Sequence, residues 1–230
     1  WVWSAGLEAV ATNEREGDVQ GISAPTQTYY VIALPLRAAL DTSDNLLDPA
    51  RGARAALRVS PEFSLSAGRN VGYVRIQADA SAYLPVGKAA VLAARVRFGS
   101  IPGAPIDDIA PSRRFYAGGG GSVRGFGYQE IGPRDSLGVP SGGRSLSEFS
   151  LEARVKTGLF GGGLSLVPFI DAGTVDAGTT PTFRGMRFGA GLGLRYQTGF
   201  GPIRLDVGTP LNRRPGESPV AVYVALGQAF

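Results

Sequence analysis

Arginine and the carboxylates are the side chains of this sequence that can do chemistry, because histidine and cysteine are both absent. Ser-His-Asp and Cys-His catalysis need a histidine, and protein zinc sites mostly use histidine or cysteine ligands. Of the 23 basic residues only Lys88 and Lys156 are lysines. Arginine is preferred where a planar cation must hold a carboxylate at two points. The composition therefore predicts paired ions inside a protein that is not an enzyme and has neither a cofactor nor a metal.

Two other clusters could be read as ligand-binding sites, one for phosphate and one for calcium, and each has a simpler explanation. The glycine run 118–121 lacks the Lys-Ser/Thr pair and the helix of a phosphate-binding loop, so it predicts a flexible loop neck. Asp41, Asp44 and Asp48 do not have the spacing of a helix–loop–helix calcium site, and no glycine follows at the sixth position. We interpret these three residues as parts of a solvated turn.

The basic residues, which give a net charge of +4, are dispersed at strand-like intervals. A surface that binds nucleic acid normally clusters its lysines and arginines on one face. We therefore expect no nucleic-acid partner, and we expect most arginines to point inward. The expected inward arginines are Arg54, Arg58, Arg75, Arg95, Arg97, Arg154, Arg187, Arg195 and Arg204. Their expected partners are Glu62, Asp79, Glu148, Glu152, Asp171 and Asp206.

Strict alternation of polar and apolar residues is the main structural signal. From Glu148 to Lys156 every second residue is apolar and every residue between is polar. The same pattern recurs in residues 53–63 and 73–84. A period of two residues is typical of β-strands with one apolar face. The pattern predicts strands near residues 1–12, 27–40, 53–64, 72–85, 89–99, 147–156, 164–174, 186–197, 201–210 and 220–230.

Alternation alone fits both a soluble β-sandwich and a transmembrane β-barrel. The expected strands have about 9–12 residues, the length that a tilted strand needs to cross a bilayer, whereas soluble strands usually have about 5–6. Tight turns near 85–88 and 198–201 alternate with longer connections such as 100–146. Barrels combine short periplasmic turns with long external loops. The sequence therefore predicts an all-β transmembrane antiparallel barrel of about ten strands, with its C-terminus on the periplasmic side.

Four strings, in a fixed order, give a family resemblance. They are RFYAGG at 114–119, SVRGF at 122–126, PFIDAG at 168–173 and GPIRLD at 201–206. In this order they resemble the outer-membrane assembly superfamily that includes BamA, TamA and the two-partner secretion pores. VRGF is the most specific mark of that superfamily. The string GGRSL at 142–146 is most similar to TamA, and residues 44–52 resemble the family's periplasmic turn.

This resemblance implies how the chain is organised. Members of the family carry periplasmic POTRA domains and a barrel of sixteen strands with a long loop folded into the lumen. Residues 1–230 would be an outer-membrane β-barrel domain, the C-terminal part of such a barrel without POTRA domains and early strands. The start at Trp1, without an initiator methionine, agrees with a fragment. The family's first strand, which pairs with the last at a lateral gate, would then be absent.

The resemblance also assigns roles within the lumen loop. The motif residues here are Val123, Arg124, Gly125 and Phe126. In the family the arginine pairs with carboxylates of the barrel wall, and their positions correspond to Asp171 and Glu152 in this sequence. A bidentate arginine–carboxylate clamp supplies both energy and geometry. The clamp would either plug and stabilise the lumen or act directly in client handling.

The last expected strand, residues 220–230, resembles the C-terminal signal by which outer-membrane proteins are recognised for assembly. That signal would comprise Tyr223, Leu226, Gly227 and Phe230. By alternation Tyr223 and Gly227 point inward, whereas Leu226 and Phe230 face lipid. Aromatic residues are favoured at the membrane interface, so we expect Phe230 at the periplasmic one.

The resemblance implies that the protein inserts or translocates client proteins at the bacterial outer membrane. Its partners would be membrane lipids, client outer-membrane or secreted proteins, and an inner-membrane-anchored protein reached through the absent POTRA domains. Two alternatives remain. One is a two-partner-type pore that secretes unfolded polypeptides, and the other is a passive barrel anchor or channel.

Overall fold

The computed structural model describes residues 1–14, 18–19, 22–23, 26–66, 68–199 and 201–230. Within these ranges twelve strands form one antiparallel sheet, and β3 (Asp18–Val19) pairs separately with β4 (Ile22–Ser23). Three short 3-10 helices, η1 (Ile106–Asp108), η2 (Pro111–Arg113) and η3 (Phe160–Gly162), lie in the connections. No helix of the described ranges is both long enough and apolar enough to cross a membrane.

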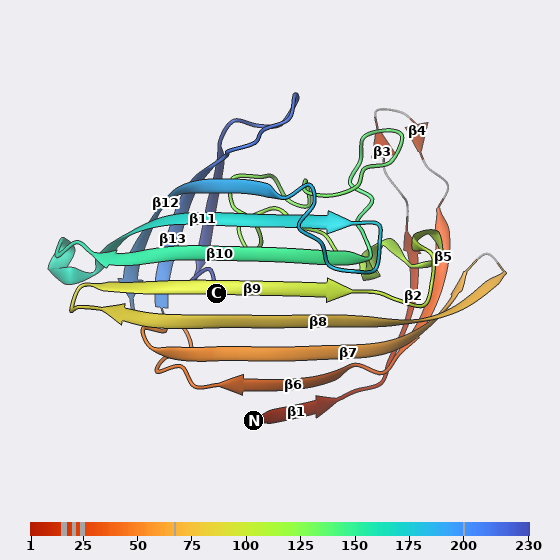
Figure 1. Cartoon of the computed structure of the whole chain (residues 1–230), viewed down its shortest axis with the longest axis horizontal. Helices are drawn as coiled ribbons and strands as arrows, with labels where there is room; N and C mark the ends of the chain where they lie inside the picture. Colours follow the sequence, from red (N-terminus) through yellow and green to blue (C-terminus); the bar gives the residue numbers. More distant parts are fainter. Residues whose placement is uncertain (15–17, 20–21, 24–25, 67, 200) are drawn as a thin grey trace.

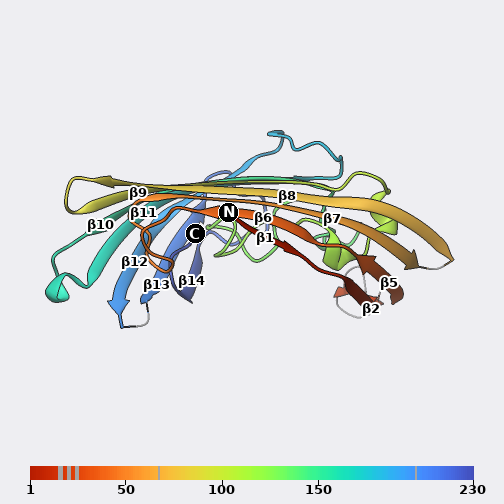
Figure 2. The ribbon, with the colours of Figure 1, turned by 90° about the horizontal axis from the view of Figure 1, so that it is seen from below.

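The main sheet is a series of neighbouring antiparallel strands. Its members are β1 (Val2–Ala5), β2 (Glu8–Glu14), β5 (Gln27–Ala33), β6 (Leu36–Asp41), β7 (Gly52–Ser66), β8 (Arg69–Val86), β9 (Ala90–Ser100), β10 (Ser145–Lys156), β11 (Leu164–Asp176), β12 (Arg187–Thr198), β13 (Gly201–Pro210) and β14 (Ala221–Leu226). From β6 to β14 each strand pairs with the next along the chain, as Figure 1 shows. Seen from below, the sheet is an arch (Figure 2). It is a barrel wall with two open edges, because β1, β2 and β14 each pair with one described strand only.

The first two strands expected from the sequence are each interrupted, so the ten expected strands form twelve in the described sheet. Pro35 separates β5 from β6, because proline has no N–H for the strand ladder. The facing strand breaks at the same level, where the amide of Gly6 donates to the carbonyl of Pro35 at 3.0 Å. The amide of Leu34 donates in turn to the carbonyl of Pro61 in β7, also at 3.0 Å. Beyond this level β2 and β5 turn away from β1 and β6 (Figure 1).

The two faces of the sheet differ as alternation predicted. In β13 the residues Pro202, Arg204 and Asp206 are buried, whereas Ile203, Leu205 and Val207 are exposed. The same outward apolar exposure is found at Leu57, Leu84, Leu92, Leu151 and Leu192. An exposed apolar band opposite a buried charged face is the pattern of a wall with lipid outside and a polar lumen inside. The all-β transmembrane fold class is confirmed.

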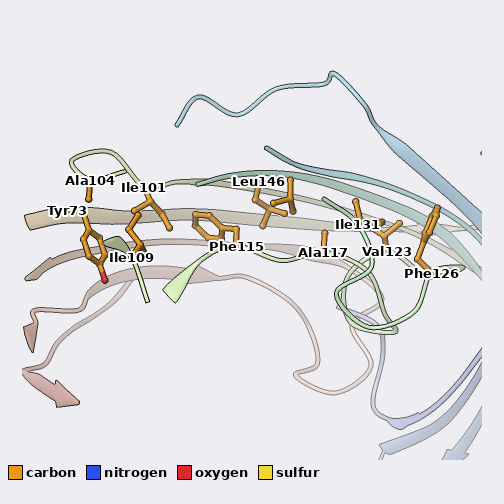
Figure 3. Close-up of a cluster of buried hydrophobic side chains, with 11 residues drawn as sticks. Tyr73, Ile101, Ala104, Ile109, Phe115, Ala117, Val123, Phe126, Ile131 and Leu146 are labelled. Atoms are coloured by element: carbon orange, nitrogen blue, oxygen red, sulfur yellow. The ribbon is translucent and has the colours of Figure 1, made fainter. Parts of the chain in front are cut away.

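The connection between β9 and β10, residues 101–144, is called the lumen loop here. It lies on the concave side of the arch (Figure 2). Apolar side chains of the loop pack against one another and against the wall, in a row that Figure 3 shows. The cluster comprises Tyr73, Ile101, Ala104, Ile109, Phe115, Ala117, Val123, Phe126, Ile131, Leu146 and Val175. The loop is therefore packed inside the wall, as the resemblance implied.

Candidate functional site

The centre of the lumen is a clamp between the loop and two wall strands. Arg124 of the loop donates from Nε to Oδ2 of Asp171 at 2.7 Å and from Nη2 to Oδ1 at 2.9 Å. Its backbone amide adds a third bond to Asp171 Oδ2 at 2.9 Å. Nη1 donates to Oε2 of Glu152 at 2.9 Å. Asp171 lies on β11 and Glu152 on β10, so one guanidinium joins the loop to both strands.

The clamp lies in a fully buried environment. Arg124 is 1% exposed, and its guanidinium carbon lies 3.7 Å from the centroid of the Phe169 ring. Both carboxylates are equally buried. A bidentate ion pair of this kind is strongly directional, and removing one partner leaves an uncompensated buried charge. The structure therefore brings together Arg124, Asp171 and Glu152, the three residues that the sequence singled out.

Around the clamp, further arginines and carboxylates of the wall form ion pairs. Most of the arginines that alternation assigned to the inside take part. The short pairs within the wall are Arg58–Asp79 and Arg195–Asp206 at 2.6 Å, Arg97–Asp79 at 2.7 Å, Arg154–Glu152 at 2.8 Å and Arg97–Glu148 at 2.9 Å. Cross-strand pairs of opposite charge stabilise a sheet by about 0.2–1 kcal/mol each. The network holds the inner faces of β8 to β13 in one register.

The loop backbone around Arg124 lies directly on the wall, and glycines make this possible. A β-carbon at Gly189 of β12 would overlap the carbonyl oxygen of Arg124. Gly125 has a φ of +101°, and a β-carbon there would lie 2.8 Å from the carbonyl oxygen of Thr209. Glycine alone fits such a close approach in a left-handed conformation. The sequence analysis singled out Gly125 as a motif residue but missed Gly189, whose only signal was a strand unusually rich in glycine.

Two wall arginines also hold the loop through its carbonyl groups. Arg95 donates to the carbonyls of Gly121 and Ser122 at 3.1 and 3.0 Å, and Arg204 donates to that of Gly120 at 3.0 Å. The hydroxyl of Ser122 donates a hydrogen bond to Glu148. These contacts hold residues 120–122, which directly precede the motif, against the wall.

Tyr223 of β14 contacts the motif from the last strand. Its hydroxyl accepts a hydrogen bond from the amide of Gly125 at 3.0 Å and donates one to the carbonyl of Phe126 at 2.6 Å. Val123 and Phe126 are buried in the apolar cluster at the end nearest this contact (Figure 3). All four motif residues are therefore packed against the wall or the last strand.

A comparison with protein families identifies this arrangement. The model of the Omp85 superfamily domain matches residues 11–230. The chain belongs to the Omp85 superfamily. The family resemblance drawn from the VRGF and accompanying strings is confirmed, and this Omp85 chain is part of a bacterial outer-membrane β-barrel.

Two relatives show how much of a longer protein the chain covers. It is 28% identical over 207 residues to the outer membrane protein assembly factor BamA of Nitratidesulfovibrio vulgaris, which is 85% of this chain and 25% of that protein. Its fold is similar to the crystal structure of BamA from Haemophilus ducreyi lacking POTRA domains 1–3, with a TM-score of 0.65 and 19% identity. That match covers 92% of this chain and 44% of the other. The Omp85 chain thus spans about a quarter of the curated relative.

The end of the Omp85 chain departs from the expected strand. β14 ends at Leu226, and Gly227 follows with a φ of +82°. Phe230 does not face lipid: its ring lies 5.2 Å from the guanidinium carbon of Arg95 and 5.8 Å from that of Arg154. Arg154 also donates to the carbonyl of Phe230 at 3.2 Å. The prediction of a lipid-facing Phe230 was wrong, because the left-handed glycine redirects the tail into the lumen.

A second anchor of the Omp85 lumen loop was not foreseen. Arg113 of η2 pairs with Glu8 of β2 at 2.8 Å and lies 3.7 Å from Glu62 of β7. The hydroxyl of Tyr73 donates to Glu62 at 3.0 Å. Among these residues only Glu62 was expected to face inward. Arg113 lies in an irregular segment, where the two-residue alternation of a strand does not indicate which way a side chain points. Its partners could therefore not be predicted from the sequence pattern.

Proposed function

We propose that this Omp85 chain is the wall of an assembly factor that inserts client proteins into the bacterial outer membrane, or moves them across it, without covalent chemistry. One observation carries the proposal. The Arg124 clamp fixes the lumen loop against the inner face of β10 and β11, and the same loop contacts β14, whose outer edge has no described partner.

The outer edge of β14, which pairs with no described strand, supplies a physical reason for strand pairing. Unpaired backbone N–H and C=O groups in hydrocarbon cost several kcal/mol each. Pairing of another strand with an open strand edge is therefore strongly favourable. A client strand would pair with this edge by β-augmentation. Main-chain hydrogen bonds carry that type of recognition, so clients of different sequence can use one edge.

The finer parts of the proposal concern partners and orientation. We propose client outer-membrane or secreted proteins and membrane lipids as the partners, and a TamA-like role with an inner-membrane-anchored protein reached through POTRA domains. The GGRSL string at 142–146 supports the TamA-like role. A periplasmic C-terminus is supported by the short turns at the same end of the sheet, such as 87–89 between β8 and β9.

The test reconstitutes the full-length protein in liposomes and follows the folding of an unfolded outer-membrane client. We expect the wild type to accelerate folding and Arg124→Lys to lower the rate at least tenfold, since lysine keeps the charge but not the bidentate geometry. Arg213→Lys, at an exposed residue between β13 and β14, is the matched control. A wild type that exports an unfolded polypeptide but folds no client would identify a secretion pore, and ion conductance alone would identify a passive channel.

A further inference from the structure

Tyr223 makes the contact between β14 and the turn of the lumen loop at Gly125–Phe126. One hydroxyl group bonds two successive residues of the motif, as acceptor from Gly125 and as donor to Phe126. The aromatic ring lies under the loop as well. A β-carbon at Gly120 would be 3.0 Å from Cδ1 of Tyr223 and 3.2 Å from its Cβ. The loop therefore rests on both the ring and the hydroxyl of Tyr223.

The strand that carries Tyr223 has few other attachments. β14 has six residues and six register pairs with β13, whereas β12 and β13 share ten. Its apolar side chains Val222, Val224 and Leu226 are exposed on the outer face. On its inner face, Tyr223 is the residue of β14 that reaches the lumen loop among the described contacts. A short strand with one described neighbour depends strongly on each such contact.

From this geometry we infer that Tyr223 is a positioning residue that couples the lumen loop to the edge strand. While its hydroxyl holds Gly125 and Phe126, β14 is held inward against the loop, and its outer edge, which pairs with no described strand, is restrained. Movement of the loop away from Tyr223 releases β14, so that an extended client strand can pair along its edge. This inference rests on the proposed function, and it names the internal contact that controls the edge.

The first experiment tests the contact without any activity. Hydrogen exchange of the full-length protein, measured by mass spectrometry, should show the β14 amides of Tyr223→Phe exchanging roughly 20-fold faster than in the wild type, the factor expected for the loss of two hydrogen bonds. Tyr196→Phe is the matched control, since Tyr196 lies on the outer face of β12. Unchanged exchange of β14 in Tyr223→Phe would overturn the inference.

The second experiment tests the coupling. The chain has no cysteine, so the pair Gly120→Cys and Tyr223→Cys can form only the intended disulfide. A β-carbon at Gly120 lies 3.2 Å from Cβ of Tyr223, close to the separation of about 3.5–4.5 Å found in disulfides. Oxidation should lower client folding at least tenfold, and reduction should restore it. Folding at the wild-type rate by the oxidised protein would disprove the coupling.

These outcomes separate the inference from the proposed function. If the wild type folds no client, the proposed function fails, while the exchange experiment still decides whether Tyr223 holds β14. If the wild type folds clients and the oxidised variant does so equally fast, the proposed function stands and the coupling through Tyr223 fails.

Discussion

Arg195 and Arg204 lie directly opposite each other on β12 and β13, with the carboxylate of Asp206 between their guanidinium groups. Arg195 Nη1 is 2.6 Å from Oδ1 of Asp206, and Arg204 Nε is 3.4 Å from Oδ2. All three side chains are buried. Like charges directly opposite each other destabilise a sheet. The carboxylate of Asp206 is thus the shared and nearest counter-ion of two facing arginines in the wall beside the Arg124 clamp.

Replacing Asp206 should weaken the barrel. Asp206→Asn removes the carboxylate that Arg195 and Arg204 share and leaves Arg195 with only the longer contact to Glu152 at 3.9 Å. Breaking a buried pair of this kind costs about 3–5 kcal/mol. We expect a lower midpoint of unfolding in urea. The midpoint is measured from the change in gel mobility between the folded and the unfolded barrel. Asp107→Asn, at an exposed carboxylate of the lumen loop, is the control and should leave the midpoint unchanged. Equal midpoints for the two variants would contradict the role given to Asp206.

A second prediction concerns the close contact between loop and wall. The added methyl group of Gly189→Ala would overlap the carbonyl oxygen of Arg124, so the loop must move and the clamp must lengthen. Overpacking of this kind costs about 1–3 kcal/mol. Gly121→Ala is the matched control in the loop, because a β-carbon there meets no atom within 4 Å. The midpoint of urea unfolding should be lower for Gly189→Ala than for Gly121→Ala. Equal midpoints would mean that the loop backbone does not lie in close contact with β12.

Much of the wall could be predicted because alternation directly reports which face a side chain occupies. That is why the inward position of Glu152 followed from the sequence pattern. The inward position of Asp171 came from the family string PFIDAG, and the clamp could be assigned once the VRGF string was seen. The irregular lumen loop has no such period. The contacts of Arg113 with Glu8 and Glu62 depend on where the loop returns to the wall, which only the folded chain determines.

Local backbone breaks were the other limit of prediction. Pro35 was read as part of a continuous strand, although proline cannot donate to the ladder and the facing strand breaks beside it. Gly227 was likewise placed inside the last strand. A glycine is compatible with an extended strand and with a left-handed turn alike, so the sequence did not determine the direction of the tail beyond it.

A third prediction concerns the turn between β6 and β7, where pH should act through Asp44. The carboxylate of Asp44 accepts hydrogen bonds from the amides of Ala50 at 2.8 Å and Arg51 at 3.1 Å, and these bonds lower its pKa. A lowered pKa in the folded state means that the turn is fully stabilised above the unfolded pKa of about 3.9 and loses this contribution as the pH falls through the lower folded pKa.

Nuclear magnetic resonance of the protein in micelles can follow this titration. The amide resonances of Ala50 and Arg51 should shift together with the carboxyl carbon of Asp44, with a common midpoint below the ordinary value. In Asp44→Asn both amides should lose that titration. A midpoint at or above the ordinary value would contradict the hydrogen bonds that cap this turn.

The last prediction tests the path of the chain after β14. Because Gly227 turns the tail inward, residues 224 and 230 should lie in different environments, although a continued strand would place both on the lipid face. Val224 is 74% exposed on the outer surface, whereas the Phe230 ring contacts Arg95 and Arg154.

Spin labels on Val224→Cys and Phe230→Cys can be compared in liposomes, since the chain has no other cysteine. The label at 224 should be relaxed by oxygen, which concentrates in lipid, and the label at 230 by a water-soluble nickel complex. A label on Leu226→Cys, which is 69% exposed, should behave like the one at 224 and so place the change of environment at Gly227. If all three labels responded to oxygen alone, the last strand would continue along the lipid face and the contact of Phe230 with the lumen arginines would be refuted.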